Sequence, residues 1–271
     1  MMRLLIIIRD GVRIFRASGS FDRAAAISFY ALFSIIPLML LITAGLGFIL
    51  GTHSDIFEKV VDMTRKSLPY LSERIVKDLA GLSRSWKAWG WLSVIMLLLS
   101  AELVLDSAAE ALIDVFDVRT KFGFFRKKLV NFAILLVALL TALASILVTA
   151  AANILLEVRV VLFGVDLSYY LIEGLALTFI LPFVLMVVSV TFVFKMFSGS
   201  NLSVRFAFYG SLFFASIWEV SKYLFAFYIS NFAQYNKFYG SLSTVMILLL
   251  WLFFSANIFL FSASLARAAY K

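Results

Sequence analysis

Four ionisable side chains lie within largely apolar stretches of the sequence: Glu102, Asp106, Glu219 and Lys222. A charge inside a bilayer is energetically expensive and marks a candidate site for a substrate, an ion or a proton. Glu102, Asp106 and Glu110 recur every four residues, so a helix would place them in one slowly drifting stripe. Such a stripe could bind cations, relay protons or pair with basic groups on another helix. No basic partner at matching depth is evident in the sequence.

Glu219 and Lys222 are three residues apart, a spacing at which two side chains can pair on one helix. Burying two charges is at best neutral in free energy unless further hydrogen bonds complete the site. The pair therefore has two interpretations. It either meets a substrate headgroup or carries a proton, or it is a neutralised contact that locks helix packing while Lys222 extends toward water.

The residue types that most enzymes need are scarce in this sequence. There is no cysteine, and His53 is the only histidine, so thiolate chemistry and the usual zinc ligand sets are excluded. We therefore expect no catalytic residue, no metal, no cofactor and no enzymatic activity. The net charge of +8 is explained by lysine and arginine flanking membrane spans, so no nucleic-acid partner is expected.

The elements that hold these residues are expected to be membrane-spanning helices. The chain of 271 residues is 63% hydrophobic and only 15% charged, too apolar for a soluble domain. Several uncharged runs are long enough to cross about 30 Å of hydrocarbon. The sequence predicts an all-α polytopic membrane helix bundle, a single domain over 1–271, with spans near 24–50, 89–111, 129–156, 173–195, 206–229 and 241–266. We expect Asn131, Asn153 and Asn257 to form interhelical hydrogen bonds.

Two segments outside the spans also have helical periodicity. In the cytoplasmic segment 1–23, four apolar residues share one helix face and three arginines line the face beside it (Leu5, Ile8, Val12 and Phe15; Arg9, Arg13 and Arg16). This pattern fits either a helix lying on an anionic membrane surface or a helix packed on the bundle. The segment 52–88 is predicted to form two amphipathic helices on the external side. Pro37 and Pro182 are candidate helix breaks, because each removes a backbone hydrogen bond.

Lysine and arginine counts predict the orientation of the chain. Five lie in 1–23 and five in 112–128, but only one lies in 157–172 and one in 230–240. The seven in 52–88 weaken the contrast, although five acidic residues accompany them. Since short cytoplasmic loops are enriched in basic residues, both termini are expected in the cytoplasm.

Two stretches of the sequence form recognisable motifs. The first is Ser28-Phe29-Tyr30-Ala31-Leu32-Phe33-Ser34-Ile35-Ile36-Pro37. The second is Trp218-Glu219-Val220-Ser221-Lys222-Tyr223-Leu224-Phe225, followed by Tyr239-Gly240-Ser241-Leu242 and Trp251. Both resemble signatures of the YihY/BrkB family of bacterial inner-membrane proteins. The positions that carry the resemblance are Tyr30, Ser34, Pro37, Trp218, Glu219, Lys222, Tyr239, Gly240 and Trp251. The chain departs from the family at Asp114 and Phe116, where Asn and Trp are usual, and at Ser262-Ala263-Ser264, which replaces a usual Gly-Ala-Glu.

The resemblance implies six spans, an inner-membrane location and a role at the bacterial envelope. Family members have been linked to serum resistance, a virulence trait, and to transport of lipid or lipopolysaccharide precursors. An older ribonuclease label conflicts with the absence of a metal-ligand cluster in the sequence. The first hypothesis is a transporter or flippase of an amphipathic cell-envelope lipid, with membrane lipids as partners. The alternatives are a non-transporting envelope-stability scaffold and an ion-coupled carrier of a small solute.

Overall fold

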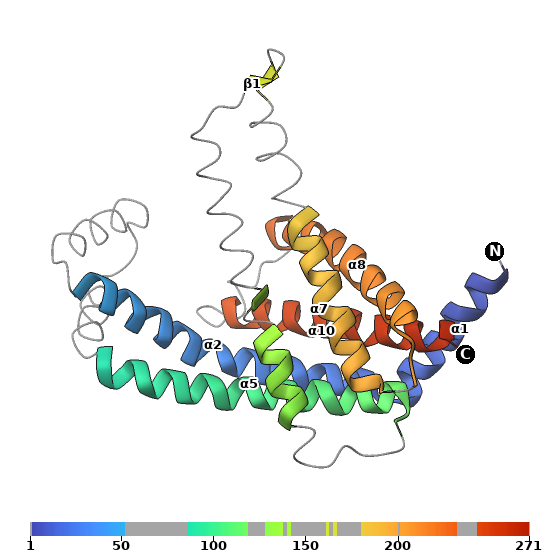
Figure 1. Ribbon diagram of the computed structural model, residues 1–271, viewed down its shortest axis with the longest axis horizontal. Helices are drawn as coiled ribbons and strands as arrows, with labels where there is room; N and C mark the ends of the chain where they lie inside the picture. Colours follow the sequence, from blue (N-terminus) through green and yellow to red (C-terminus); the bar gives the residue numbers. More distant parts are fainter. Residues whose placement is uncertain are drawn as a thin grey trace. The chain divides into compact units, whose positions relative to one another are not determined.

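Long α-helices make up most of the residues that the computed structural model describes, which are 2–51, 86–118, 128–137, 140–141, 161–162, 165–166, 180–199, 201–231 and 243–270. The helices are α1 (Met2–Ala17), α2 (Ser20–Gly51), α5 (Trp86–Phe116), α7 (Leu181–Ser198), α8 (Val204–Asn231) and α10 (Ser243–Tyr270) (Figure 1). A shorter apolar helix spans Lys128–Val137. Two short strands, β1 (Val161–Leu162) and β2 (Val165–Asp166), pair antiparallel.

The prediction of an all-α membrane bundle is confirmed. Five of the described helices contain segments long and apolar enough to cross a membrane, namely Ser20–Leu41, Gly90–Phe116, Leu181–Ser198, Val204–Ile229 and Val245–Tyr270. They coincide with the first, second, fourth, fifth and sixth predicted spans. The third predicted span, 129–156, coincides at its start with the helix Lys128–Val137. Residues 52–85 of the predicted external loop lie outside the described residues, and α5 begins at Trp86, three residues before the predicted second span.

The chain divides into two compact units, Met1–Ile27 with Leu105–Lys271, and Ser28–Val104. In the second unit, α2 presents Phe29, Phe33 and Ile36 with more than half of each side chain exposed. Pro37 lies inside the first predicted span and is buried, and α2 continues past it to Gly51, so this candidate break does not end the helix. In the same unit, Ser93 and Ser100 are buried on α5. This distribution is typical of a spanning helix, with small polar side chains inside and large apolar ones directed toward lipid.

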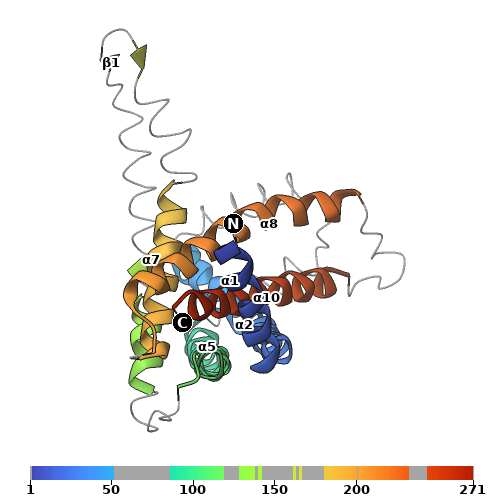
Figure 2. The same ribbon diagram turned by 90° about the vertical axis from the view of Figure 1, so that its right-hand side faces the viewer.

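In the first unit, α8 packs against both α7 and α10, and α10 also packs against α1 (Figures 1 and 2). Phenylalanine rings occupy the middle of this packing. Phe194 of α7 lies 5.9 Å from Phe116 and 5.2 Å from Phe259, and Phe214 of α8 lies 5.6 Å from Phe259, measured between ring centroids. Such ring pairs add about 0.5–1.5 kcal/mol each beyond the apolar area that they bury.

The N-terminal segment packs on the bundle, one of the two arrangements that its sequence allows. Phe15 of α1 makes an edge contact with Phe261 of α10, their ring centroids 5.9 Å apart. Gly11 is buried against Leu265, and a Cβ atom there would lie 2.6 Å from the tip of that side chain. Contact of the exposed Leu5 and Ile8 with a membrane surface stays a prediction.

Two glycines with positive φ mark the ends of helices, as expected for a residue without a Cβ atom. Gly19 (φ 61°) separates α1 from α2, and Gly199 (φ 56°) follows α7. Lys195 closes the turn after α7 by donating hydrogen bonds to the carbonyl oxygens of Gly199 (2.7 Å) and Leu202 (2.8 Å). A cation at a helix C-terminus also stabilises the helix dipole.

Candidate functional site

The predicted pair on α8 is formed. The Nζ atom of Lys222 lies 2.8 Å from Oε1 and 2.7 Å from Oε2 of Glu219. The glutamate side chain is 25% exposed and the lysine side chain 40% exposed. Counted from Val204 at the start of α8, Lys222 lies about 27 Å along the helix at 1.5 Å per residue. The pair therefore lies in the half of the span that is farther from Val204.

Aromatic side chains surround this pair and connect α8 with α10. The Nζ atom of Lys222 lies 5.1 Å from the ring centroid of Trp218, within the range of a cation–π interaction. Trp218 donates a hydrogen bond from Nε1 to Oγ of Ser255 at 3.2 Å, and its ring lies 5.9 Å from that of Trp251. The fold therefore brings together four of the positions that carry the family resemblance, Trp218, Glu219, Lys222 and Trp251.

An apolar groove lies between α8 and α10. Its volume is about 220 Å³, and the residues that line it are Ser221, Leu224, Phe225, Tyr228, Leu250 and Phe254. Phe225 joins the groove to the aromatic cluster, because its ring centroid lies 4.8 Å from that of Trp251. The rings of Trp218, Trp251 and Phe225 thus connect the ion pair to the apolar groove. A charged site and an apolar groove together are complementary to an amphipathic molecule.

The acidic stripe of α5 has the basic partners that the sequence did not reveal. Lys128 places Nζ 3.5 Å from Oδ2 of Asp106, and Asn131 donates a hydrogen bond to Oδ1 of the same carboxylate at 2.7 Å. Both partners lie on the helix Lys128–Val137. Of the roles left open for the stripe, pairing with a basic group on another helix is therefore the one that the structure shows for Asp106. The interhelical hydrogen bond predicted for Asn131 is confirmed.

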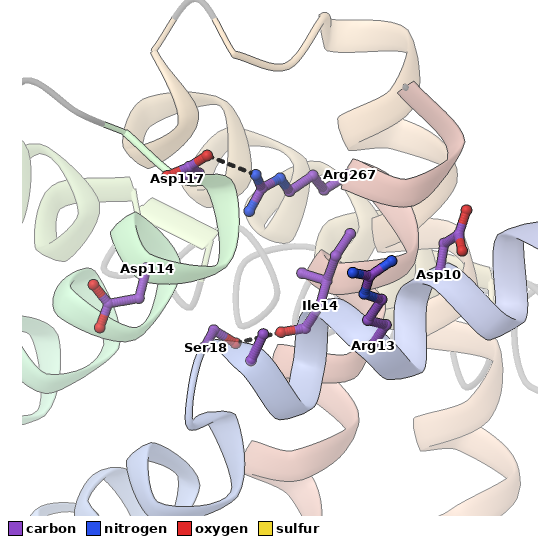
Figure 3. A pocket seen from close by; sticks show the side chains of 8 residues that line it. Asp10, Arg13, Ile14, Ser18, Asp114, Asp117 and Arg267 are labelled. Carbon is purple, nitrogen blue, oxygen red and sulfur yellow. Dashed lines mark hydrogen bonds and ion pairs between the residues drawn. The ribbon is translucent and has the colours of Figure 1, made fainter.

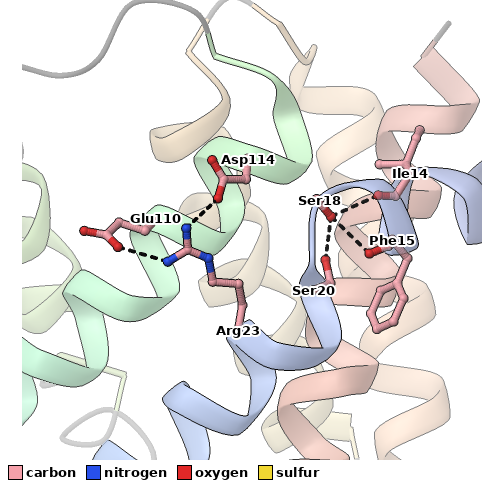
Figure 4. A network of polar contacts seen from close by, with 7 residues as sticks. All are labelled: Ile14, Phe15, Ser18, Ser20, Arg23, Glu110 and Asp114. Carbon is pink, nitrogen blue, oxygen red and sulfur yellow. Dashed lines mark hydrogen bonds and ion pairs between the residues drawn. The ribbon is translucent and has the colours of Figure 1, made fainter.

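Arg23 of α2 holds the next two carboxylates of the stripe. Its Nη1 atom donates to Glu110 at 3.1 Å and its Nη2 atom donates to Asp114 at 2.8 Å, as Figure 4 shows. From the sequence, Glu110 and Asp114 are expected near a membrane edge, where a carboxylate needs no special role. The signal that could have revealed this contact is Arg23 itself, the last charged residue before the apolar run of the first span.

The C-terminus of α5 is fixed by residues from two other parts of the first unit. Asp117 adopts a left-handed conformation (φ 51°), and the amide of Val118 donates back to the carbonyl of Ile113. Arg267 of α10 donates to the carbonyl oxygen of Val115 (2.6 Å) and to Oδ2 of Asp117 (2.9 Å). Asn201, in the turn before α8, donates to the carbonyl oxygen of Asp117 at 3.0 Å. Sequence spacing gave no indication of these contacts.

The other predicted positions lie apart from the pair on α8. Tyr30 is half-buried on α2, its ring 5.7 Å from that of Phe29, and Ser34 donates to the carbonyl oxygen of Ala31 at 2.6 Å. Glu102 is half-buried on α5, in the second unit. Tyr239, Gly240 and Asn153 lie outside the described residues.

Two expectations about single positions change with the structure. Pro182 lies in the first turn of α7, where a helix tolerates a proline because the missing N–H has no partner inside the helix. The residues before Ile180 in the fourth predicted span lie outside the described part of the chain. The expectation that Asn257 bonds between helices is wrong, since its Nδ2 donates within α10 to the carbonyl oxygen of Phe253 at 2.8 Å.

Residues 12–271 match the family model "Virulence factor BrkB". This chain belongs to the BrkB family. The resemblance drawn from the two motifs is thereby confirmed. Since the match covers nearly the whole chain, the pair on α8, its aromatic cluster and the groove all belong to the BrkB domain.

Three curated relatives that this chain resembles are named UPF0761 membrane proteins. One from Pseudomonas paraeruginosa is 28% identical over 244 residues, which make up 90% of this chain and 58% of the relative. One from Alkalilimnicola ehrlichii is 28% identical over 261 residues, covering 94% of this chain and 56% of the relative. One from Coxiella burnetii is 24% identical over 258 residues, which make up 93% of this chain and 88% of the relative. The chain thus spans less than three fifths of the first two. No solved structure matches this chain.

Proposed function

We propose that this BrkB-family membrane protein is a transporter or flippase of an amphipathic lipid of the bacterial cell envelope. In this proposal it lies in the inner membrane with both termini in the cytoplasm, and membrane lipids are its partners. We also infer that it is not an enzyme, because the site on α8 offers an ion pair and an apolar groove rather than a nucleophile beside a base.

The observation that carries the proposal is the aromatic cluster that connects the ion pair of α8 to the groove between α8 and α10. The Glu219–Lys222 pair can meet a polar headgroup, and the groove lined by Leu224 and Phe254 can receive part of an acyl chain. A lipid that crosses a membrane must move its headgroup through a low-dielectric region, where paired charges lower the cost of desolvation.

A second candidate is a non-transporting scaffold that stabilises the envelope. It is favoured by the pairing of Asp106 with Lys128 and of Glu219 with Lys222, because charges that neutralise each other need no substrate. The hypothesis of an ion-coupled carrier rested on the acidic stripe of α5. We do not propose it, since Lys128 and Arg23 hold Asp106, Glu110 and Asp114 in ion pairs.

Lipid scrambling in liposomes separates the two candidates. Purified protein is reconstituted into vesicles that contain a fluorescent phospholipid, and an impermeant quencher reports how much of that lipid reaches the outer leaflet. A transporter increases the quenched fraction above that of protein-free vesicles, in proportion to the protein added. A scaffold leaves the fraction at the protein-free value, and that result would refute the transport proposal.

A further inference from the structure

A polar cavity of about 500 Å³ lies between α1, the C-terminal end of α5 and the C-terminal end of α10, apart from the pair on α8. The residues that line it are Asp10, Arg13, Ile14, Ala17, Ser18, Asp114, Asp117 and Arg267. Figure 3 shows the Asp117–Arg267 pair on one side of this cavity, and Asp10 and Arg13 of α1 on the other (Figure 3). The volume is sufficient for a small polar group.

Most of the charged side chains around the cavity have a partner among the described residues, but one does not. Arg267 binds Asp117 and Arg23 binds Asp114, while Arg9 contacts Asp10 at 3.3 Å. Arg13 makes no hydrogen bond or ion pair within the part of the chain that the structure describes, although its guanidinium carries five N–H donors. The cavity therefore has one cation whose hydrogen-bonding capacity is unused.

Carboxylate oxygens with unused acceptor capacity share the cavity with Arg13. Arg9 binds Oδ1 of Asp10 and Arg267 binds Oδ2 of Asp117, so each carboxylate keeps a second oxygen without a described protein donor. An ionised carboxylate has about four acceptor positions. The three donors of a primary ammonium can use such oxygens, whereas a trimethylated ammonium has no N–H donor.

These charges limit the chemistry of a ligand. A multiply charged anion would be repelled by Asp10, Asp114 and Asp117, and a simple cation would leave Arg13 unused. A metal ion is disfavoured because no group of three histidine, cysteine, aspartate or glutamate side chains suited to a metal occurs among the described residues. The ligand whose charges match those of the cavity is a zwitterion with a singly charged phosphate and a primary amine.

The position of the cavity indicates that the zwitterion is part of a lipid. On α1, Ile6, Asp10, Arg13 and Ala17 follow one another along a single helical stripe. Ile6 is 45% exposed, so the stripe passes from the charged cavity to an apolar surface within one turn. A headgroup in the cavity would therefore leave its apolar part beside Ile6.

We propose that this cavity binds the headgroup of a zwitterionic phospholipid with a primary amine, with its phosphate at Arg13 and its ammonium at the carboxylates of Asp10 and Asp117. This inference rests on the proposed role in lipid handling, because it takes the ligand from the membrane. It goes beyond that role by naming the headgroup chemistry and a second place at which the chain holds it.

The test is lipid retention by the full chain in detergent, measured by native mass spectrometry with phosphatidylethanolamine and phosphatidylcholine of identical acyl chains. We expect the amine-bearing lipid to be retained about tenfold more tightly, the size of effect expected for charge-assisted hydrogen bonds. The variant Arg13→Gln should lose this preference. Arg16→Gln is the matched control, since Arg16 has the same charge on the same helix but does not line the cavity. Equal retention of both lipids by the native chain, or an equal loss in both variants, would overturn the proposal.

Two further measurements keep the result unambiguous. Arg13→Lys keeps the charge and should keep the preference for the amine-bearing lipid, while thermal unfolding in detergent shows whether each variant is folded. Glycerophosphoethanolamine, the free headgroup, should compete only at about a hundredfold higher concentration because it lacks the apolar contacts. Competition at equal concentration would identify a soluble ligand and refute the assignment to a lipid.

Scrambling is measured on the same preparations, so the two proposals can fail separately. Selective binding without scrambling would refute transport and leave the cavity as a lipid site. Scrambling without selective binding would refute the assignment of the cavity as a lipid site and would leave the transport proposal intact.

Discussion

Glu219 and Lys222 of α8 form an ion pair that also contacts an aromatic ring. Their charged atoms lie within 2.8 Å of each other. The ammonium of Lys222 lies over the ring of Trp218, and Trp218 donates a hydrogen bond to Ser255. These contacts come from α10, so they depend on how two spans pack.

Removing both charges of the pair distinguishes a structural role from a functional one. Each single change, Glu219→Gln or Lys222→Met, should lower the free energy of unfolding by about 1–3 kcal/mol, because it leaves one charge half-buried without its partner. The double variant should be more stable than either single variant. If the pair meets a headgroup, the double variant stays folded but loses scrambling activity. Thermal unfolding in detergent and scrambling in liposomes check the two parts, and a stable, fully active double variant would contradict the functional assignment.

At the scale of the helices, close approach between α8 and α10 depends on Gly210. A Cβ atom on Gly210 would lie 2.7 Å from Cβ of Ala266, 3.1 Å from the carbonyl oxygen of Ser262 and 3.3 Å from the ring of Phe194. Two of these three neighbours belong to α10, and the carbonyl is part of its backbone. Small residues that let helix backbones approach are the usual basis of packing between spans.

The variant Gly210→Ala tests this packing against a matched control. It should lower the free energy of unfolding by about 1–3 kcal/mol, because neither the backbone carbonyl nor Ala266 can move aside without separating the helices. Gly11→Ala on α1 should cost less. Its nearest neighbour is the flexible end of Leu265, and alanine favours a helix by about 1 kcal/mol over glycine. Thermal unfolding in detergent compares the two, and equal losses would show that α8 and α10 have room to separate.

The sequence predicts the helices better than it predicts the contacts between them. Long uncharged runs locate the spans, because only a helix of about 20 residues satisfies its backbone inside lipid. The contacts of Arg23 with Glu110 and Asp114 join residues 87 and 91 positions apart, and no periodicity encodes such distances. The same is true of Arg267, which reaches the end of α5 from 150 residues away. The cavity beside α1 therefore could not be predicted, although Arg13 and Asp10 were visible in the sequence.

For the molecule as a whole, the apolar surface and the charged groups are divided as a lipid environment requires. Large apolar side chains are exposed along α2, α5, α7, α8 and α10, where they can face acyl chains. Asp106 and Glu219, both within the spans, are each paired with a lysine, and the polar cavity lies at the ends of α1, α5 and α10. The chain spans less than three fifths of the length of the first two relatives, and the helical domain is the part that they share.

If a lipid passes along the groove between α8 and α10, a larger side chain that fills the groove should slow its transport. Leu224→Trp adds volume at the groove, whereas Val220→Trp adds the same kind of side chain one turn away on α8, where it does not line the groove. Initial scrambling rates are measured in liposomes with equal amounts of folded protein. We expect Leu224→Trp to lower the rate about tenfold, equivalent to about 1.4 kcal/mol in the barrier, and Val220→Trp to leave it unchanged. Equal rates in the native chain and in Leu224→Trp would show that no lipid passes along this groove.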